Sequence, residues 1–203
     1  KDETIVDQNL YIPKGFKVII KPKQKILLVN NAFIISNSSW MIGGNNGETL
    51  ITGKKNNFGG GILITNNSSI TLKNLIIENI HSGGQGPAIF MNGNASSIMS
   101  NCIVRQNSSG LLPNHLGFGG GIYVENSTLT INHCSISDNT ASKNGGGIYI
   151  KDNAIVNIDS SEIINNNSDT IGSDGHGGGI SIFDNSLVSI TNCLIRDNIC
   201  NTG

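Results

Sequence analysis

Isoleucine, leucine and valine alternate with polar residues along most of the chain. The clearest examples are the segments 127–139, 154–166 and 186–198, which superimpose without gaps. Alternation with a period of about two, interrupted by Asn, Ser and Gly, is typical of short β-strands joined by turns. No segment in this region keeps the helical period of about 3.6 residues. The pattern therefore predicts an all-β protein.

A triglycine followed by isoleucine recurs and marks an internal repeat. It reads GGGILI, GGGIYV, GGGIYI and GGGISI, and a weaker form, QGPAIFM, lies between the first two. An asparagine follows each anchor isoleucine at a nearly constant distance, whereas the gap to the next anchor varies. The segment of constant length is therefore expected to form the structural framework, and the segment of variable length is expected to form surface loops. The anchors are Ile62, Ile89, Ile122, Ile148 and Ile180, and the asparagines are Asn79, Asn107, Asn139, Asn166 and Asn198.

The repeat length predicts a solenoid. Anchors lie 26 to 33 residues apart, which suits three short strands per coil of a parallel β-helix whose coils stack about 4.8 Å apart. One coil cannot bury its inward Ile and Val alone, so neighbouring coils stabilise one another. We expect the recurrent asparagine to tolerate a left-handed backbone and to form a hydrogen-bonded ladder between coils. We expect the glycines to permit a crowded corner.

We interpret residues 1–203 as a single β-helix domain. Residues 1–58 are expected to form irregular N-terminal coils, with outward lysines that are either a solvated face or an anion-binding stripe. Residues 59–203 carry the repeat. We also expect the chain to be a fragment of a longer protein, with further coils or self-association covering its open C-terminal end.

Composition narrows the classes of partner. Thirteen Lys and Arg balance fourteen Asp and Glu, so no gross charge indicates nucleic acid. No apolar run of about 18 residues predicts a membrane-spanning helix. Three of the four cysteines, Cys102, Cys134 and Cys193, occupy one repeat position. Parallel stacking points their side chains the same way, which favours buried free thiols over a disulfide or a metal site.

The repeat resembles those of polymorphic outer-membrane-type surface proteins, in which Gly-Gly-(Ala/Ile/Leu) alternates with Phe-x-x-Asn. Here the second element reads VRQN, ISDN, IINN and IRDN, with Ile or Val in place of Phe. More broadly the chain is similar to the pectin-lyase-like superfamily over roughly residues 59–200. The resemblance implies a right-handed parallel β-helix, and the five anchors plus about two coils from residues 1–58 give about seven coils. It implies no single function, because that superfamily contains lyases, hydrolases and adhesins.

Aromatic side chains follow the anchors. If Ile122 and Val124 point inward, then Tyr123 points outward, and the same register stacks Phe90, Tyr123 and Tyr149 on successive coils. An exposed aromatic stripe of this kind suits the apolar faces of a sugar chain, whereas stacked aromatics that only stabilise the strands are the alternative.

Three acidic residues, Glu125, Asp152 and Asp184, each precede an asparagine at the end of this strand. Beside the aromatic stripe they would bind the hydroxyls of a glycan. Clustered carboxylate oxygens also suit Ca²⁺. The three are weak calcium candidates, because like charges at this spacing need no metal. No other cofactor is expected.

The sequence DGHGG resembles the Gly-His-Gly element of polygalacturonase-like hydrolases. The resemblance implies His176, Asp174 and Asp152 as weak catalytic candidates. That chemistry needs paired carboxylates, yet the neighbouring strand offers a single aspartate, and Phe118 and Asn144 fill the positions equivalent to His176. His176 is therefore interpreted first as a loop residue.

Three functions follow as hypotheses. The first is a non-catalytic cell-surface or secreted module for adhesion or glycan binding through the aromatic stripe and adjoining loops. The second is a polysaccharide lyase or glycoside hydrolase with a groove beside the same strand. The third is a structural spacer. All three place the chain at the cell surface or outside the cell.

Overall fold

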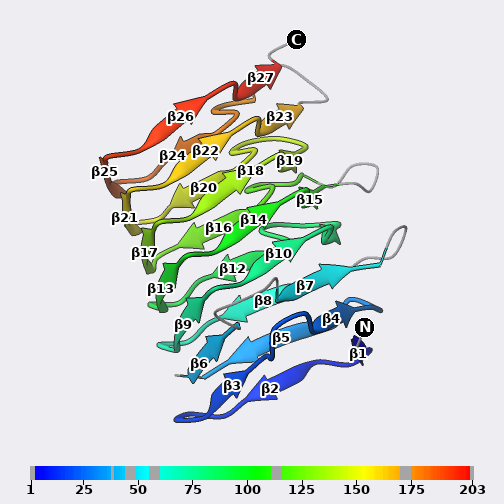
Figure 1. Ribbon diagram of the computed structural model, residues 1–203. Helices are drawn as coiled ribbons and strands as arrows, with labels where there is room; N and C mark the ends of the chain where they lie inside the picture. The colour runs from blue at the N-terminus through cyan, green and yellow to red at the C-terminus, as the bar shows by residue number, and fades with distance from the viewer. Residues whose placement is uncertain are drawn as a thin grey trace.

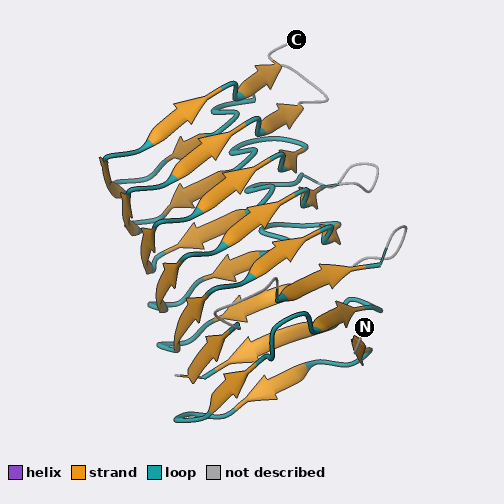
Figure 2. Cartoon of the chain, in the orientation of Figure 1, coloured by secondary structure: helices purple, strands orange, loops and turns teal. Residues whose placement is uncertain are grey.

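The computed structural model describes residues 3–37, 39–43, 49–54, 60–110, 116–169 and 175–201. The chain winds into a tall stack of coils, with the N-terminus at one end and the C-terminus near the other (Figure 1). All regular structure in the described ranges is β-strand (Figure 2). Every strand pairing is parallel. The predicted all-β parallel solenoid is confirmed.

The strands form four sheets that run the length of the stack. The first sheet contains β1 (Glu3–Val6), β4 (Lys25–Leu28), β7 (Leu50–Gly53), β10 (Ile76–Glu78), β14 (Ile103–Arg105), β18 (Ser135–Ser137), β22 (Glu162–Ile164) and β26 (Leu194–Arg196). The second contains β2 (Leu10–Ile12), β5 (Phe33–Ser36), β8 (Gly61–Ile64), β12 (Ile89–Met91), β16 (Ile122–Glu125), β20 (Ile148–Lys151) and β24 (Ile180–Ile182).

The third sheet contains β3 (Lys17–Ile19), β6 (Ser39–Ile42), β9 (Ser69–Lys73), β13 (Ser96–Ser100), β17 (Thr128–Asn132), β21 (Ile155–Asp159) and β25 (Leu187–Thr191). The fourth is made of very short strands, β11 (His81–Ser82), β15 (Ser108–Ser109), β19 (Thr140–Ala141), β23 (Asn167–Asp169) and β27 (Ile199–Asn201).

Each coil takes its strands from the sheets in turn, from the first three sheets in the first three coils and from all four sheets afterwards. β1 to β3 make the first coil and β22 to β25 the seventh, after which β26 and β27 begin another. The expected seven coils are therefore present, and two of them precede residue 49. The expectation of three strands per coil holds for the described residues of the first three coils and is wrong from the fourth coil onward, where the fourth sheet adds a short strand.

The anchor isoleucines stack as predicted. Ile62 pairs with Ile89, Ile89 with Ile122, Ile122 with Ile148, and Ile148 with Ile180. The first four are fully buried and belong to one continuous aliphatic core inside the coils. Burial of apolar surface at roughly 25 cal/mol per Å² is the main term that holds such a column together.

Left-handed turn positions explain the abundance of asparagine. Residues with positive φ recur at the same corners of successive coils, and most of them are Asn or Asp, whose short polar side chains tolerate this conformation. One corner, between the third and first sheets, shows the rule and its exceptions in a column of Asn74, Asn101, His133, Ser160 and Asn192.

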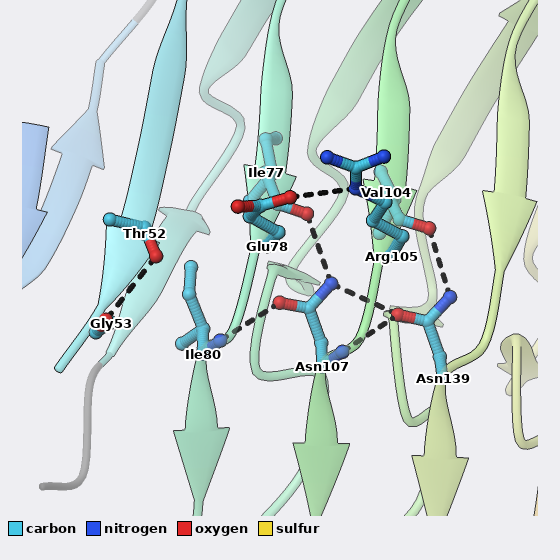
Figure 3. A network of polar contacts seen from close by, with 9 residues as sticks. All are labelled: Thr52, Gly53, Ile77, Glu78, Ile80, Val104, Arg105, Asn107 and Asn139. Atoms are coloured by element: carbon cyan, nitrogen blue, oxygen red, sulfur yellow. Dashed lines mark hydrogen bonds and ion pairs between the residues drawn. The ribbon is translucent and has the colours of Figure 1, made fainter. Parts of the chain in front are cut away.

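A second set of asparagines forms a buried ladder between coils (Figure 3). We call Asn107, Asn139, Asn166 and Asn198 the asparagine ladder. The backbone N–H of Asn107 donates to Asn139 Oδ1 at 3.1 Å, and Asn107 Nδ2 donates to the same oxygen at 2.9 Å. The second amide hydrogen of Asn139 goes to the Val104 carbonyl at 2.9 Å, and this geometry recurs one coil later. At this turn the side-chain amide oxygen of each ladder asparagine accepts the backbone N–H of the preceding coil, in place of a backbone carbonyl.

Two details of the predicted asparagine role are wrong. Asn79 is not in the ladder, because it occupies the left-handed position before it, and the buried Ile80 takes the ladder place. Ile80 begins the ladder by donating its N–H to Asn107 Oδ1 at 3.0 Å. The left-handed conformation itself belongs to the preceding residues, such as Gln106 and Asp138, and not to the ladder asparagines.

The aligned cysteines form a similar ladder. Cys102 and Cys134 are buried and free, and the backbone N–H of Cys102 donates to Cys134 Sγ at 3.4 Å. The N–H of Cys134 donates in turn to Ser161 Oγ at 3.0 Å. The predicted buried thiols are confirmed for these two residues, whereas Cys193, in the last complete coil, is half-buried. The Cys134 thiol thus accepts a hydrogen bond at this corner, and the Cys102 and Cys134 thiols donate to the backbone carbonyls of Ser100 and Asn132.

Each position of the repeated triplet requires glycine for a different structural reason. Gly145 has a φ of 66°, which favours glycine. A Cβ on Gly146 would lie 2.4 Å from the backbone carbonyl of Asn167, and one on Gly147 would lie 3.0 Å from the side chain of Asn166. The triplet therefore makes a left-handed turn, approaches the fourth sheet backbone to backbone, and covers the asparagine ladder.

Candidate functional site

The aromatic residues beside the anchors stack as predicted. The rings of Phe90 and Tyr123 lie 4.9 Å apart and nearly parallel, and those of Tyr123 and Tyr149 lie 5.4 Å apart. Phe183 extends the row, with its ring 5.4 Å from that of Tyr149. None of the four belongs to the core cluster inside the coils. The row therefore lies on the outer face of the second sheet.

The prediction that this stripe is exposed is wrong. Tyr123 is only 4% exposed and Tyr149 only 8%. The segments that lead into the glycine corner fold back over the outer face of the sheet. A Cβ on Gly86 would lie 2.7 Å from that of Tyr123, and the ring of Phe118 lies 5.0 Å from that of Tyr149. The aromatic rings thus pack in a second apolar layer and stabilise the strands.

His176 belongs to this covering segment. Its backbone N–H donates to Asn144 Oδ1 at 2.9 Å, and its exposed ring lies 5.9 Å from that of Phe183. Phe118 and Asn144 are paired in the preceding coils at the same position. The structure thus confirms that one slot accepts Phe, Asn and His, as expected of a loop residue.

The candidate catalytic set is not assembled. His176 lies before the strands of the second sheet, whereas Asp152 follows β20, at the opposite end of these strands. Asp174 lies outside the described residues. The hydrogen bonds and ring contact of His176 in the described parts of the chain involve no carboxylate.

The acidic residues cluster around a lysine. Lys151 Nζ lies 2.8 Å from Asp152 Oδ2 and 3.1 Å from Glu125 Oε1. Tyr123 donates its hydroxyl hydrogen to Glu125 Oε2 at 3.4 Å. The aromatic row and the charged cluster therefore meet at Tyr123. Asp184 lies one coil further along and is exposed.

The expected alignment of these acids differs by one residue. Glu125 pairs in register with Lys151, because the turn after β16 is one residue shorter than the turn after β20. Asp152 instead occupies a left-handed turn position. This offset places the ammonium of Lys151 between the two carboxylates.

The charges of the cluster reinforce one another. The hydrogen bond from Lys151 holds the pKa of Asp152 below its usual value, and the Asp152 and Glu125 carboxylates raise the pKa of Lys151. Burial raises the pKa of the Tyr123 hydroxyl. Asp152 and Lys151 therefore stay ionised, and Tyr123 neutral, near pH 7.

The calcium hypothesis gains no support from this geometry. A lysine already bridges two of the three candidates, Glu125 and Asp152. Within the described residues no group of three or more His, Cys, Asp and Glu side chains is arranged to hold a metal ion. Ca²⁺ prefers several oxygen ligands around one point, and these residues do not fit that requirement.

A groove lies where the strands of the second sheet end. It has a volume of about 570 Å³ and spans four successive coils. Its walls are amides and carboxylates, and it continues over the corner toward β21 through a smaller hollow that reaches Ile155. We call it the corner groove, and it is lined by Asn66, Asn92, Gly93, Glu125, Asn126, Asp152 and Asn153.

The corner groove contains two predicted site residues, Glu125 and Asp152, and several that were missed. The missed residues are the asparagines, which sequence reasoning assigned only to turns. A signal was present, since successive copies of the same strand are followed by Asn66, Asn92, Asn126 and Asn153. Asp184, Phe90 and Tyr149 are not among the groove-lining residues.

Comparison with known proteins identifies the family. No curated protein and no solved structure matches the chain. No helix in the described residues is long and apolar enough to cross a membrane. The family model described as "Right handed beta helix region" matches residues 18–202, nearly the whole chain. With its all-parallel sheets and stacked coils, the chain belongs to the right-handed β-helix family.

Proposed function

We propose that this β-helix is a non-catalytic module that binds a glycan in the corner groove. The observation that carries the proposal is the groove itself, which crosses four coils and is walled by amide and carboxylate groups. The buried aromatic row supports its floor through Tyr123, whose hydroxyl bonds Glu125. Binding through an exposed aromatic stripe is no longer part of the hypothesis.

The repeat of the groove suits a polymer of sugars. Each coil advances by about 4.8 Å, which is close to the length of one pyranose in an extended polysaccharide. Successive coils present Asn66, Asn92 and Asn126. An amide both donates and accepts hydrogen bonds, as a sugar hydroxyl does, so each coil offers similar contacts to the next sugar. For a polysaccharide of the cell surface or the extracellular matrix, the proposal implies a secreted or cell-surface protein.

The protonation states favour binding over catalysis. Hydrolysis of a glycoside needs one protonated carboxylic acid to donate to the leaving oxygen. The lowered pKa of Asp152 leaves that group ionised, and the raised pKa of Lys151 removes it as a neutral base for elimination. Asp152 therefore supports hydrogen-bond acceptance, not proton transfer.

Two groove substitutions test the site. Asn92→Ala with Glu125→Ala removes an amide and a carboxylate from positions where φ is not positive, so the backbone accepts both changes. Loss of two contacts to sugar hydroxyls is expected to weaken binding at least about tenfold. The measurement is calorimetric titration with neutral hexasaccharides of glucose and of N-acetylglucosamine.

The matched control removes the same residue types elsewhere. Asn157→Ala with Glu162→Ala changes two exposed residues on β21 and β22, outside the corner groove, and should leave binding unchanged. Equal affinity of the groove variant and the wild type would refute the site. Absence of binding by the wild type across the hexasaccharides would leave a structural spacer as the better description.

A further inference from the structure

We propose that the corner groove selects neutral and amino sugars and rejects polymers of uronic acid. This inference rests on the proposed function and specifies its ligand. It concerns the charge of the groove, whereas the proposed function depends on its shape and its amides. Different experiments would therefore contradict the inference and the proposed function.

The groove carries negative charge without a free cation. Its described lining contains two carboxylates, Glu125 and Asp152, and no Lys, Arg or His. The nearest ammonium is that of Lys151, which contacts both carboxylates at 3.1 and 2.8 Å. Because this ammonium is already paired with two carboxylates, it attracts an incoming anion only weakly. The three groups together keep a net charge of −1.

The surroundings add to this field. Asp184 follows β24, one coil beyond Asp152, and is exposed. From residue 121 to the end of the chain nine acidic side chains accompany three basic ones, of which Lys151 is one. The net negative charge of the C-terminal coils therefore disfavours approach of a polyanion and attracts a cation.

The register makes the repulsion systematic. A uronic acid polymer carries a carboxylate on every sugar, and the coils advance by about the length of one sugar. Any alignment in the groove would therefore bring its carboxylates close to Glu125 and Asp152. A neutral sugar escapes this repulsion, and the ammonium of glucosamine is attracted. The expected order of affinity is glucosamine first, neutral sugar next and uronate last.

The test titrates wild-type protein with hexamers of glucosamine, glucose and galacturonate at low salt. Galacturonate is expected to bind at least about tenfold more weakly than glucose. Raising the salt to about 0.5 M should narrow the difference, because the Debye length shortens. A purely steric discrimination would not change with salt, so a salt-independent gap would contradict the inference.

A charge-removal variant localises the effect. Glu125→Gln with Asp152→Asn keeps the size of both groups, releases Lys151 from its two ion pairs, and is expected to raise the ratio of galacturonate affinity to glucose affinity at least about tenfold. Glu162→Gln with Asp138→Asn removes the same charge from exposed positions outside the groove and should preserve the wild-type order. Galacturonate binding as tightly as glucose in the wild type overturns the inference but not the proposed function.

Discussion

Gly146→Ala is expected to lower the free energy of unfolding by about 4 kcal/mol or more, or to prevent folding altogether. The new Cβ would lie 2.4 Å from the backbone carbon and oxygen of Asn167 and 2.4 Å from the carbonyl oxygen of Gly178. These backbone atoms, on two segments of the next coil, cannot move aside as a flexible side chain can. Urea unfolding followed by circular dichroism, together with the soluble yield, measures the effect.

Two other glycines complete the series. Gly147→Ala meets the Gly179 carbonyl oxygen at 2.7 Å and should be damaging but less severe. Gly84→Ala meets nothing within 4 Å, and its φ is not positive, so its stability should stay within about 0.5 kcal/mol of the wild type. If Gly146→Ala unfolded at the wild-type urea concentration, the close approach of triglycine and fourth sheet would be wrong.

Asn139→Ala is expected to cost about 3 to 5 kcal/mol. The substitution removes the acceptor of the Asn107 N–H and side-chain amide, and the donor to the Val104 carbonyl and to Asn166 Oδ1. These groups are buried, so water does not replace the lost partners. The φ of Asn139 is not positive, so the loss reports hydrogen bonds and not backbone strain.

Thermal unfolding compares this variant with a surface asparagine. Asn157→Ala, on the outer face of β21, should change stability by no more than about 0.5 kcal/mol. A ladder residue that tolerated alanine as well as Asn157 does would show that the amide column contributes no net stability. Because both variants replace asparagine with alanine, a difference in their stability reports the burial and hydrogen bonds of Asn139 and not the type of residue that was replaced.

The stacking of the coils was predictable because it rests on local repetition. The spacing of the anchors fixed which isoleucines share a column, and Ile89, Ile122 and Ile148 pair as expected. The ladder was predictable for the same reason. Its start was not, since Asn79 and Asn107 look equivalent in sequence and differ by one position in the turn.

The candidate site was less predictable because alternation shows only which side of a strand a residue occupies. Tyr123 does point away from the core, but its exposure depends on a distant segment, around Gly86, that covers it. The position of Lys151 between Glu125 and Asp152 depends on the turn after β16, which is one residue shorter than the turn after β20. The period of the sequence predicts neither the segment that covers Tyr123 nor the difference in turn length.

The most direct test of glycan binding in the corner groove follows side-chain amide signals by NMR during titration with a neutral hexasaccharide. The amide resonances of Asn66, Asn92, Asn126 and Asn153, which line the groove, are expected to shift. Those of the buried ladder residues Asn107, Asn139 and Asn166 should stay in place. Shifts confined to other faces, or no shifts at saturating sugar, would contradict the account.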